Sequence, residues 1–268
     1  MIHTKIIPLT ALLFFLQQAV SAETNPIHDE WNSLLKTHVA VIDKGKKNTL
    51  NYASMASDRK HLKTYLKNLA NISQEEFDSW SRDDQLAFLI NAYNAWTVEY
   101  ILTAWPDIKS IKDLGNFLSS PWSKKFVYLL GDKRSLDNIE QELIRGSENY
   151  REPRIHFAVN CASIGCPALR AEAYIGEQLN QQLEEQTRLF LSDRDRNRVT
   201  EGVIELSSIF KWYRDDFEKG WQGYASLEQF LLNYSAALEI PEAQKRQLES
   251  REAEIKFLSY DWKLNNTP

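Results

Sequence analysis

The sequence predicts an α+β protein, with a helix-rich N-terminal half packed on a small, mostly antiparallel sheet. Three observations support this prediction. Apolar residues recur at helical spacing through the first half, short β-branched runs lie among helices in the second half, and residues 84–105 are apolar nearly all round. A helix of that last kind is typical of the middle of a domain. Because no internal repeat or long linker interrupts the pattern, we expect residues 23–268 to form a single domain.

Composition narrows the classes of function. The chain has 268 residues, of which 43% are hydrophobic and 26% charged, as in ordinary folded proteins. Its net charge of -5 gives no general attraction to nucleic acid. No run after the first 22 residues approaches the roughly 20 apolar residues of a membrane span, so we expect no transmembrane segment in the mature chain. The sequence predicts no cofactor and favours no particular oligomeric state.

Residues 1–22 have the pattern of an export signal. Lys5 is followed by an apolar run, Ile6–Leu16, and then by the small residues Val20–Ala22. Eleven residues span only about 17 Å as a helix, which is too short for a bilayer core. No cysteine follows the apolar run, which argues against a lipid anchor. We therefore expect cleavage after Ala22 and a periplasmic or secreted protein, in a compartment that favours disulfides.

The N-terminal half is predicted to consist of helices. Their spacing places them at Trp31–His38, at Asp58–Leu69, after the capping box Ser73–Glu76, and at Asp84–Trp105. Asn91 and Asn94 share one face of the last helix. A buried amide without partners costs roughly 1–3 kcal/mol. These amides therefore either contact a substrate carbonyl or its oxyanion, or hydrogen-bond to the backbone in the core.

The second half is predicted to alternate short strands and helices. The predicted elements are a strand Lys125–Leu130 turned by Gly131–Asp132, a helix Leu136–Arg145 capped by Ser135, a helix Glu177–Leu191, a strand Val199–Leu206, short helices opened by Ser207 or Ser208 and by Ser226, a helix Glu242–Leu248 and a strand Ala253–Leu258. Arg194, Arg196 and Arg198 lie among acids and indicate a solvated turn. Tyr260–Trp262 is predicted to pin the C-terminus to the core.

The stretch Arg154–Leu169 holds both cysteines and the only histidine beyond residue 61. It begins apolar and β-branched and ends in small residues and a proline, which predicts a buried strand leading into a polar loop. One interpretation is a disulfide between Cys161 and Cys166, since the four residues between them are small or flexible enough to bring the Cα atoms within about 4.4–6.8 Å. So small a loop would add little stability through chain entropy.

A second interpretation is a nucleophilic thiol at Cys161, with His156 as its base and Glu140 orienting the imidazole. On a continuous strand His156 and Cys161 would face opposite sides, so this requires a bend near Asn160. A lone histidine in an apolar strand is also often a satisfied core residue. A third interpretation is zinc held by His156, Cys161 and Cys166; it lacks a Cys-x-x-Cys pair and a further histidine, and we expect no metal site.

Five segments together resemble the domain-of-unknown-function family 547, DUF547. They are Ala87–Asn94, Ser135–Glu140, Arg154–Ser163, Leu206–Tyr213 and Tyr260–Trp262. The resemblance spans about residues 55–265. It implies a cysteine-peptidase-like fold and an enzyme that hydrolyses peptide-like substrates, such as glutathione, through a thiol. Plant members have serine where Cys166 stands, which favours Cys161 as the nucleophile. This chain departs from the family at Gln141, where a histidine is frequent.

These observations lead to one hypothesis of function and its rival. The first is an exported thiol-dependent hydrolase of amide bonds in small peptides or peptide-like thiols. Its catalytic residues would be Cys161, His156 and Glu140, and its substrate contacts Asn91, Asn94 and Ser163. The rival is a non-catalytic binding or scaffold domain of the cell envelope, stapled by a Cys161–Cys166 disulfide. A thiol–disulfide redox role is a third alternative.

Overall fold

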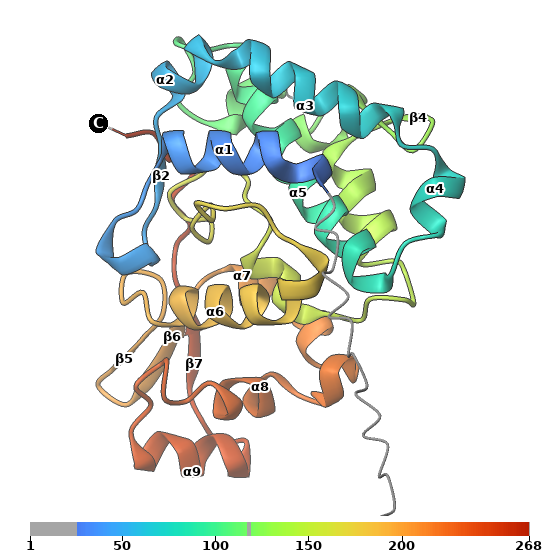
Figure 1. Cartoon of the computed structure of the whole chain (residues 1–268). Coiled ribbons are helices and arrows are strands. Elements are labelled where there is room, and N and C mark those ends of the chain that lie inside the picture. Colours follow the sequence, from blue (N-terminus) through green and yellow to red (C-terminus); the bar gives the residue numbers. More distant parts are fainter. Residues whose placement is uncertain (1–25, 117–118, 268) are drawn as a thin grey trace, which may run out of the picture.

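The computed structural model of the chain describes residues 26–116 and 119–267, so the predicted signal at 1–22 lies outside the described residues. Helices dominate, and the strands form small separate sheets of two or three strands. This confirms the α+β class. Figure 1 shows α1–α5 gathered in one part of the molecule and α6, α8 and α9 with β5–β7 in the other.

Within the described residues, five α-helices build the N-terminal part. They are α1 (Asp29–His38), α2 (Tyr52–Ser57), α3 (Arg59–Asn71), α4 (Gln74–Asp78) and α5 (Arg82–Leu102). As the apolar pattern predicts, α5 is buried along nearly its whole length and packs against α3. Ser73 caps α4 by accepting a hydrogen bond from the Glu76 backbone N–H at 3.1 Å.

The strands are short. They are β1 (Val39–Ala40) paired with β2 (Thr49–Leu50), β3 (Val127–Leu129) paired with β4 (Asp132–Arg134), and a sheet of β5 (Arg198–Thr200), β6 (Val203–Leu206) and β7 (Ile255–Phe257). All pairings are antiparallel except that of β6 with β7. Leu130 and Gly131, both with positive φ (53° and 78°), form the two-residue turn between β3 and β4.

The C-terminal part contains α6 (Leu179–Leu191), α7 (Ile209–Trp212), α8 (Leu227–Asn233) and α9 (Glu242–Ser250). Short 3₁₀-helices lie at Pro26–His28, Asp43–Gly45, Ile111–Leu114, Pro121–Ser123, Pro153–Phe157, Gly176–Gln178, Arg214–Phe217 and Trp221–Gly223. Over residues 26–116 and 119–267, no helix combines the length and the hydropathy that crossing a bilayer requires.

Two hydrophobic clusters form the core. The larger is built on α1, α3 and α5, and the smaller contains packed rings such as Phe157, Phe210 and Phe217. The C-terminal tail runs along the cysteine loop, where the Asn265 N–H donates to the Ala162 carbonyl at 3.1 Å and the Ile164 N–H donates to the Lys263 carbonyl at 2.8 Å. The Gly165 N–H also donates to the Asp261 carbonyl at 2.8 Å, so the segment Tyr260–Trp262 takes part in this contact.

Two predicted elements differ in kind. The predicted strand that begins at Arg154 is wrong, since residues Pro153–Phe157 form a 3₁₀-helix. Pro153 opens this turn, and the Glu152 carboxylate caps it by accepting from the Arg154 N–H at 3.1 Å. The predicted α-helix Leu136–Arg145 contains a π-helix over Asn138–Ile144. Its predicted cap is present, because Ser135 Oγ accepts from the Asn138 N–H at 3.1 Å.

Candidate functional site

A pocket of about 210 Å³ opens where the two hydrophobic clusters meet. Its polar lining includes Asp137, Glu140 and His156, and its wall includes both cysteines. The remaining lining residues are mostly aromatic: Tyr93, Trp122, Trp212, Tyr213, Tyr260 and Trp262, with Val159, Pro167 and Ile209. The pocket therefore brings together all three residues that the sequence proposed for catalysis.

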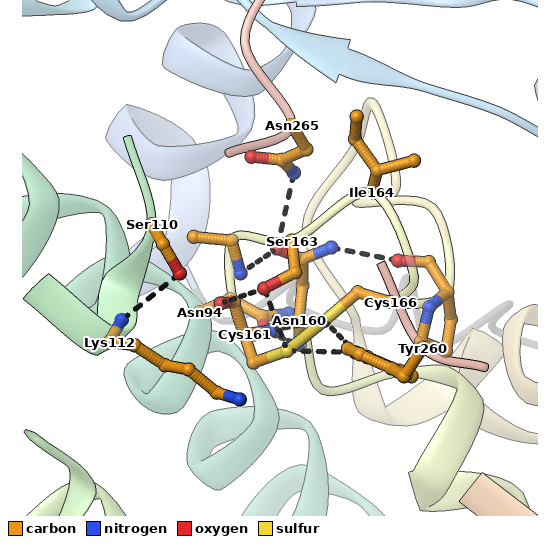
Figure 2. The surroundings of a disulfide bond; sticks show 12 residues. Asn94, Ser110, Lys112, Asn160, Cys161, Ser163, Ile164, Cys166, Tyr260 and Asn265 are labelled. Atoms are coloured by element: carbon orange, nitrogen blue, oxygen red, sulfur yellow. Dashed lines mark hydrogen bonds between the residues drawn. A yellow bond between two sulfur atoms is a disulfide. The ribbon is translucent and has the colours of Figure 1, made fainter. Parts of the chain in front are cut away.

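Cys161 and Cys166 form a disulfide in the pocket wall, with Cα atoms 6.2 Å apart. This confirms the predicted pairing (Figure 2). The Tyr260 hydroxyl lies 3.1 Å from each sulfur, and the Cys161 N–H donates to Cys166 Sγ at 2.8 Å. Cys166 is buried and Cys161 is partly exposed. Of the two residues, Cys161 is therefore the more accessible to a reagent.

The backbone bends sharply before the disulfide, as a catalytic pairing of Cys161 with His156 requires. The Asn160 N–H donates to Asn94 Oδ1 at 2.8 Å, and Asn160 Nδ2 donates to the Pro167 carbonyl at 2.7 Å. Asn160 Oδ1 in turn accepts from the Ala162 N–H at 2.8 Å, where φ is 61°. Figure 2 shows Asn94 and Asn160 beside the two cysteines. The loop is thus fixed by side-chain hydrogen bonds from Asn94 and Asn160 together with an antiparallel backbone bridge between Ser163 and Leu264.

His156 is fully buried, and its carboxylate partner is Asp216. Nε2 lies 2.7 Å from Asp216 Oδ2, and the ring stacks on Tyr213 with centroids 4.0 Å apart. Asp216 is also fully buried and binds Arg145 at 2.5 Å and Lys219 at 2.7 Å. The prediction that Glu140 orients His156 is therefore corrected, because Asp216 occupies the position beside the imidazole.

The charges of this pair determine the role of the imidazole. Burial alone would raise the pKa of Asp216, but hydrogen bonds from His156 and Arg145 outweigh it and hold the pKa well below its usual range. Burial lowers the pKa of His156, and Asp216 offsets only part of that effect. We infer a neutral ring whose Nε2–H donates to Asp216. Nδ1, which has no hydrogen-bond partner among the described residues, then carries the free lone pair.

Glu140 is a buried carboxyl group in the pocket lining. Its side chain comes from the π-helix, and the residue is 5% exposed. Oε1 has no hydrogen-bond partner in the described ranges. Burial, followed by the negative charge of Glu140, raises the pKa of both Tyr93 and Tyr213, so the carboxyl group acts on these two phenols. Glu140 is therefore a pocket residue without a role in orienting His156.

The predicted substrate contacts lie away from the pocket. Asn91 exchanges two hydrogen bonds with the backbone of Tyr174, at 2.8 and 3.0 Å. Asn94 donates to the Ala158 carbonyl at 3.0 Å and accepts from the Asn160 N–H at 2.8 Å. Ser163 is buried beside the cysteine loop and its Oγ lies 3.7 Å from Cys161 Sγ. The side-chain amides of Asn91 and Asn94 therefore hydrogen-bond to the backbone in the core, which was the second of the two predicted alternatives.

No group of three or more His, Cys, Asp or Glu side chains is arranged to hold a metal ion within the described ranges. In the described state the sulfurs of Cys161 and Cys166 are bonded to each other, so neither is a thiolate that could bind zinc together with His156. Asp216 was missed by the sequence reasoning. The only local signal is its position three residues after Tyr213, at the end of one of the segments that carry the family resemblance.

Comparison with known proteins identifies a family whose model matches part of the chain. The model of the family described as "Protein of unknown function, DUF547" matches residues 77–191. That range contains Glu140, His156 and both cysteines, whereas Asp216 and Tyr260 lie beyond it. Searches of curated proteins and of solved structures each gave no significant match.

Proposed function

For this chain, whose residues 77–191 belong to the DUF547 family, we propose a thiol-dependent hydrolase of amide bonds in small peptides or peptide-like thiols. Cys161 is the nucleophile, His156 the general base and Asp216 the group that orients the imidazole. The observation that carries the proposal is that His156 and Cys161 line the same pocket, while the imidazole has its Nε2 held by a buried carboxylate and its Nδ1 without a hydrogen-bond partner among the described residues. This is the division of roles that a base in a triad requires.

The disulfide makes the described state a resting one. A thiol or phosphine reductant must supply two electrons, and two protons complete the Cys161 and Cys166 thiols. Cys161 is the partly exposed member of the pair, whereas Cys166 is 3% exposed. Once free of Cys166, the Cys161 side chain can rotate about its Cα–Cβ bond toward the imidazole.

The reaction then follows from the arrangement. His156 Nδ1 takes the proton of the Cys161 thiol, and the thiolate attacks the amide carbon. The imidazolium, stabilised by Asp216, gives the proton to the nitrogen as the C–N bond breaks, and the amine leaves. A water molecule, deprotonated by the imidazole, attacks the thioester and breaks the S–C bond. One amide and one water become one acid and one amine, and the thiol is restored.

Hydrolysis assays with four proteins test this proposal. We would incubate wild type, Cys161→Ser, Cys166→Ser and His156→Gln with glutathione and with L-alanyl-L-alanine amide, with and without a phosphine reductant. We expect wild type to hydrolyse L-alanyl-L-alanine amide only after reduction, Cys166→Ser to act without it, and the other two variants to be inactive. Because glutathione is itself a thiol that can reduce the disulfide, the comparison with and without phosphine uses the amide alone. Amine release by Cys161→Ser equal to that of reduced wild type would exclude the mechanism.

The second candidate is a non-catalytic binding domain of the cell envelope, which the disulfide itself favours. A bonded Cys161 has no thiol to offer, and the aromatic pocket lining suits a bound ligand. Retention of the disulfide under the reducing conditions of the assay, with binding but no hydrolysis, would support this alternative.

We also propose export, with removal of residues 1–22. The basis is the charged start, apolar run and small-residue site at the N-terminus. Mass analysis of the protein recovered from cells with its natural N-terminus would give a chain beginning at Glu23. A full-length chain that stays in the cytoplasm would contradict this.

A further inference from the structure

Glu140 does not orient the imidazole in the proposed hydrolysis, because Asp216 already holds His156 Nε2. The residue is nevertheless only 5% exposed, and it lines the pocket. Its Oε1 has no hydrogen-bond partner among the described residues. A buried carboxyl oxygen without a partner costs free energy, which a donor supplied by a ligand would recover.

The charged residues that line the pocket are Asp137 and Glu140, and no lysine or arginine of the described residues is part of this lining. The nearby cations Arg145 and Lys219 are both bound to Asp216. Burial and then the charge of Glu140 raise the pKa of Asp137. In this environment a positively charged ligand group is favoured and an anionic one is disfavoured.

The aromatic walls agree with this preference. Trp212 stacks on Trp262 with ring centroids 5.7 Å apart, and Trp262 meets Trp122 edge to face at 5.6 Å. The Lys112 ammonium lies 3.8 Å from the Trp262 ring centroid, so one face of this group already holds a cation. Trp212 is 47% exposed beside it. The faces of tryptophan and tyrosine rings attract ammonium groups within about 6 Å.

We propose that this pocket binds the ammonium group of its ligand, with Glu140 Oε1 as the acceptor, Asp137 as a second negative charge and the aromatic rings as walls. The ligand class is a small peptide or amino-acid amide whose α-amine is unblocked. In this respect the inference rests on the proposed function, since it places the free amino end of the substrate beside Cys161. Glu140 is then a specificity-determining residue.

Binding to the oxidised wild-type protein tests this without any turnover. The probes are L-alanyl-L-alanine amide, which carries an ammonium group, and N-acetyl-L-alanyl-L-alanine amide, which does not. Isothermal titration calorimetry should give at least about tenfold tighter binding of the first, the size expected for a charge-assisted hydrogen bond in a buried site. Equal binding, tighter binding of the acetylated probe, or no binding of either would overturn the proposal.

Three variants test whether Glu140 and Asp137 cause the preference for the free amine. Glu140→Gln keeps the shape and removes the charge, and should abolish the preference for the free amine while leaving the acetylated probe unaffected. Glu142→Gln, an exposed neighbour on the same π-helix and outside the pocket lining, should bind as wild type does. Asp137→Asn should weaken the preference by about threefold, and it decides the question if Glu140→Gln does not fold. An unchanged preference in both pocket variants would contradict the assignment.

The ammonium site and the hydrolase can be refuted separately. Selective binding by the oxidised protein together with a reduced protein that hydrolyses nothing would leave the ammonium site intact and remove the hydrolase. Hydrolysis of free and acetylated peptides at equal rates would keep the hydrolase and remove the ammonium site.

Discussion

Replacing Asp216 with asparagine tests the buried charge network behind His156. The substitution keeps the shape of the side chain and removes one negative charge. Asp216 accepts from His156 at 2.7 Å, from Arg145 at 2.5 and 3.1 Å, and from Lys219 at 2.7 Å. An asparagine oxygen cannot balance two cations, and its amide group adds donors where donors already point.

The magnitude follows from the burial of the partners. Removing one member of a buried ion pair costs about 3–5 kcal/mol, mainly through the charge left unpaired. The side chains of Arg145 and Lys219 are 22% and 40% exposed, so both regain hydration. We therefore expect the lower limit, about 3 kcal/mol. For a chain of this size that corresponds to a fall in Tm of roughly 6–12 °C.

Urea unfolding at pH 7, followed by circular dichroism, measures the loss. The matched control is Asp215→Asn, since Asp215 is the exposed neighbour on the same short helix. Because the pKa of Asp216 falls on folding, its stabilisation is present above its usual value of about 3.8 and is lost as the pH falls through the lower folded value. The difference from wild type should therefore narrow below about pH 4. A loss under 1 kcal/mol, or one matched by Asp215→Asn, would refute the reasoning.

Three further predictions concern other contacts. Asn94→Ala leaves the Ala158 carbonyl and the Asn160 N–H without their partner, so urea unfolding should show a loss of about 2–4 kcal/mol with an unchanged slope; a loss under 1 kcal/mol would show that these two hydrogen bonds do not stabilise the fold. Iodoacetamide should label neither cysteine before reduction and Cys161 faster than Cys166 after it, and peptide mass mapping that finds the reverse order would contradict the exposure argument. Burial lowers the pKa of His28 to about 3, so its ring protons should not titrate by NMR between pH 7 and 4; a midpoint near 6.5 would show that the ring is hydrated.

Periodicity and capping rules were enough to predict most helices. Helix α5 is apolar on all sides and buried, and Ser73, Ser135 and Ser226 accept the capping hydrogen bonds that their positions predict. These features depend on residues within one or two turns of each other, so the local sequence determines them. The disulfide was also within reach, because two cysteines close in the chain leave few arrangements.

The partner of His156, by contrast, could not be predicted from the local sequence. Asp216 lies sixty positions further along the chain, and the pair forms only where the two hydrophobic clusters meet. Glu140 was predicted as the third member of a catalytic triad, and in the structure it lies on a π-helix and lines the pocket without holding His156. The apolar run after Pro153 could be either a strand or a buried turn, since periodicity does not separate short apolar segments.

The central claim is that reduction turns Cys161 into an activated nucleophile. Its most direct test is the rate of iodoacetamide reaction at Cys161 in the reduced Cys166→Ser variant, measured from pH 5 to 10. We predict a thiolate that forms well below the ordinary thiol pKa of about 8.5, with that shift lost when His156→Gln is added. A Cys161 that titrates at or above about 8.5, with or without His156, would contradict the account.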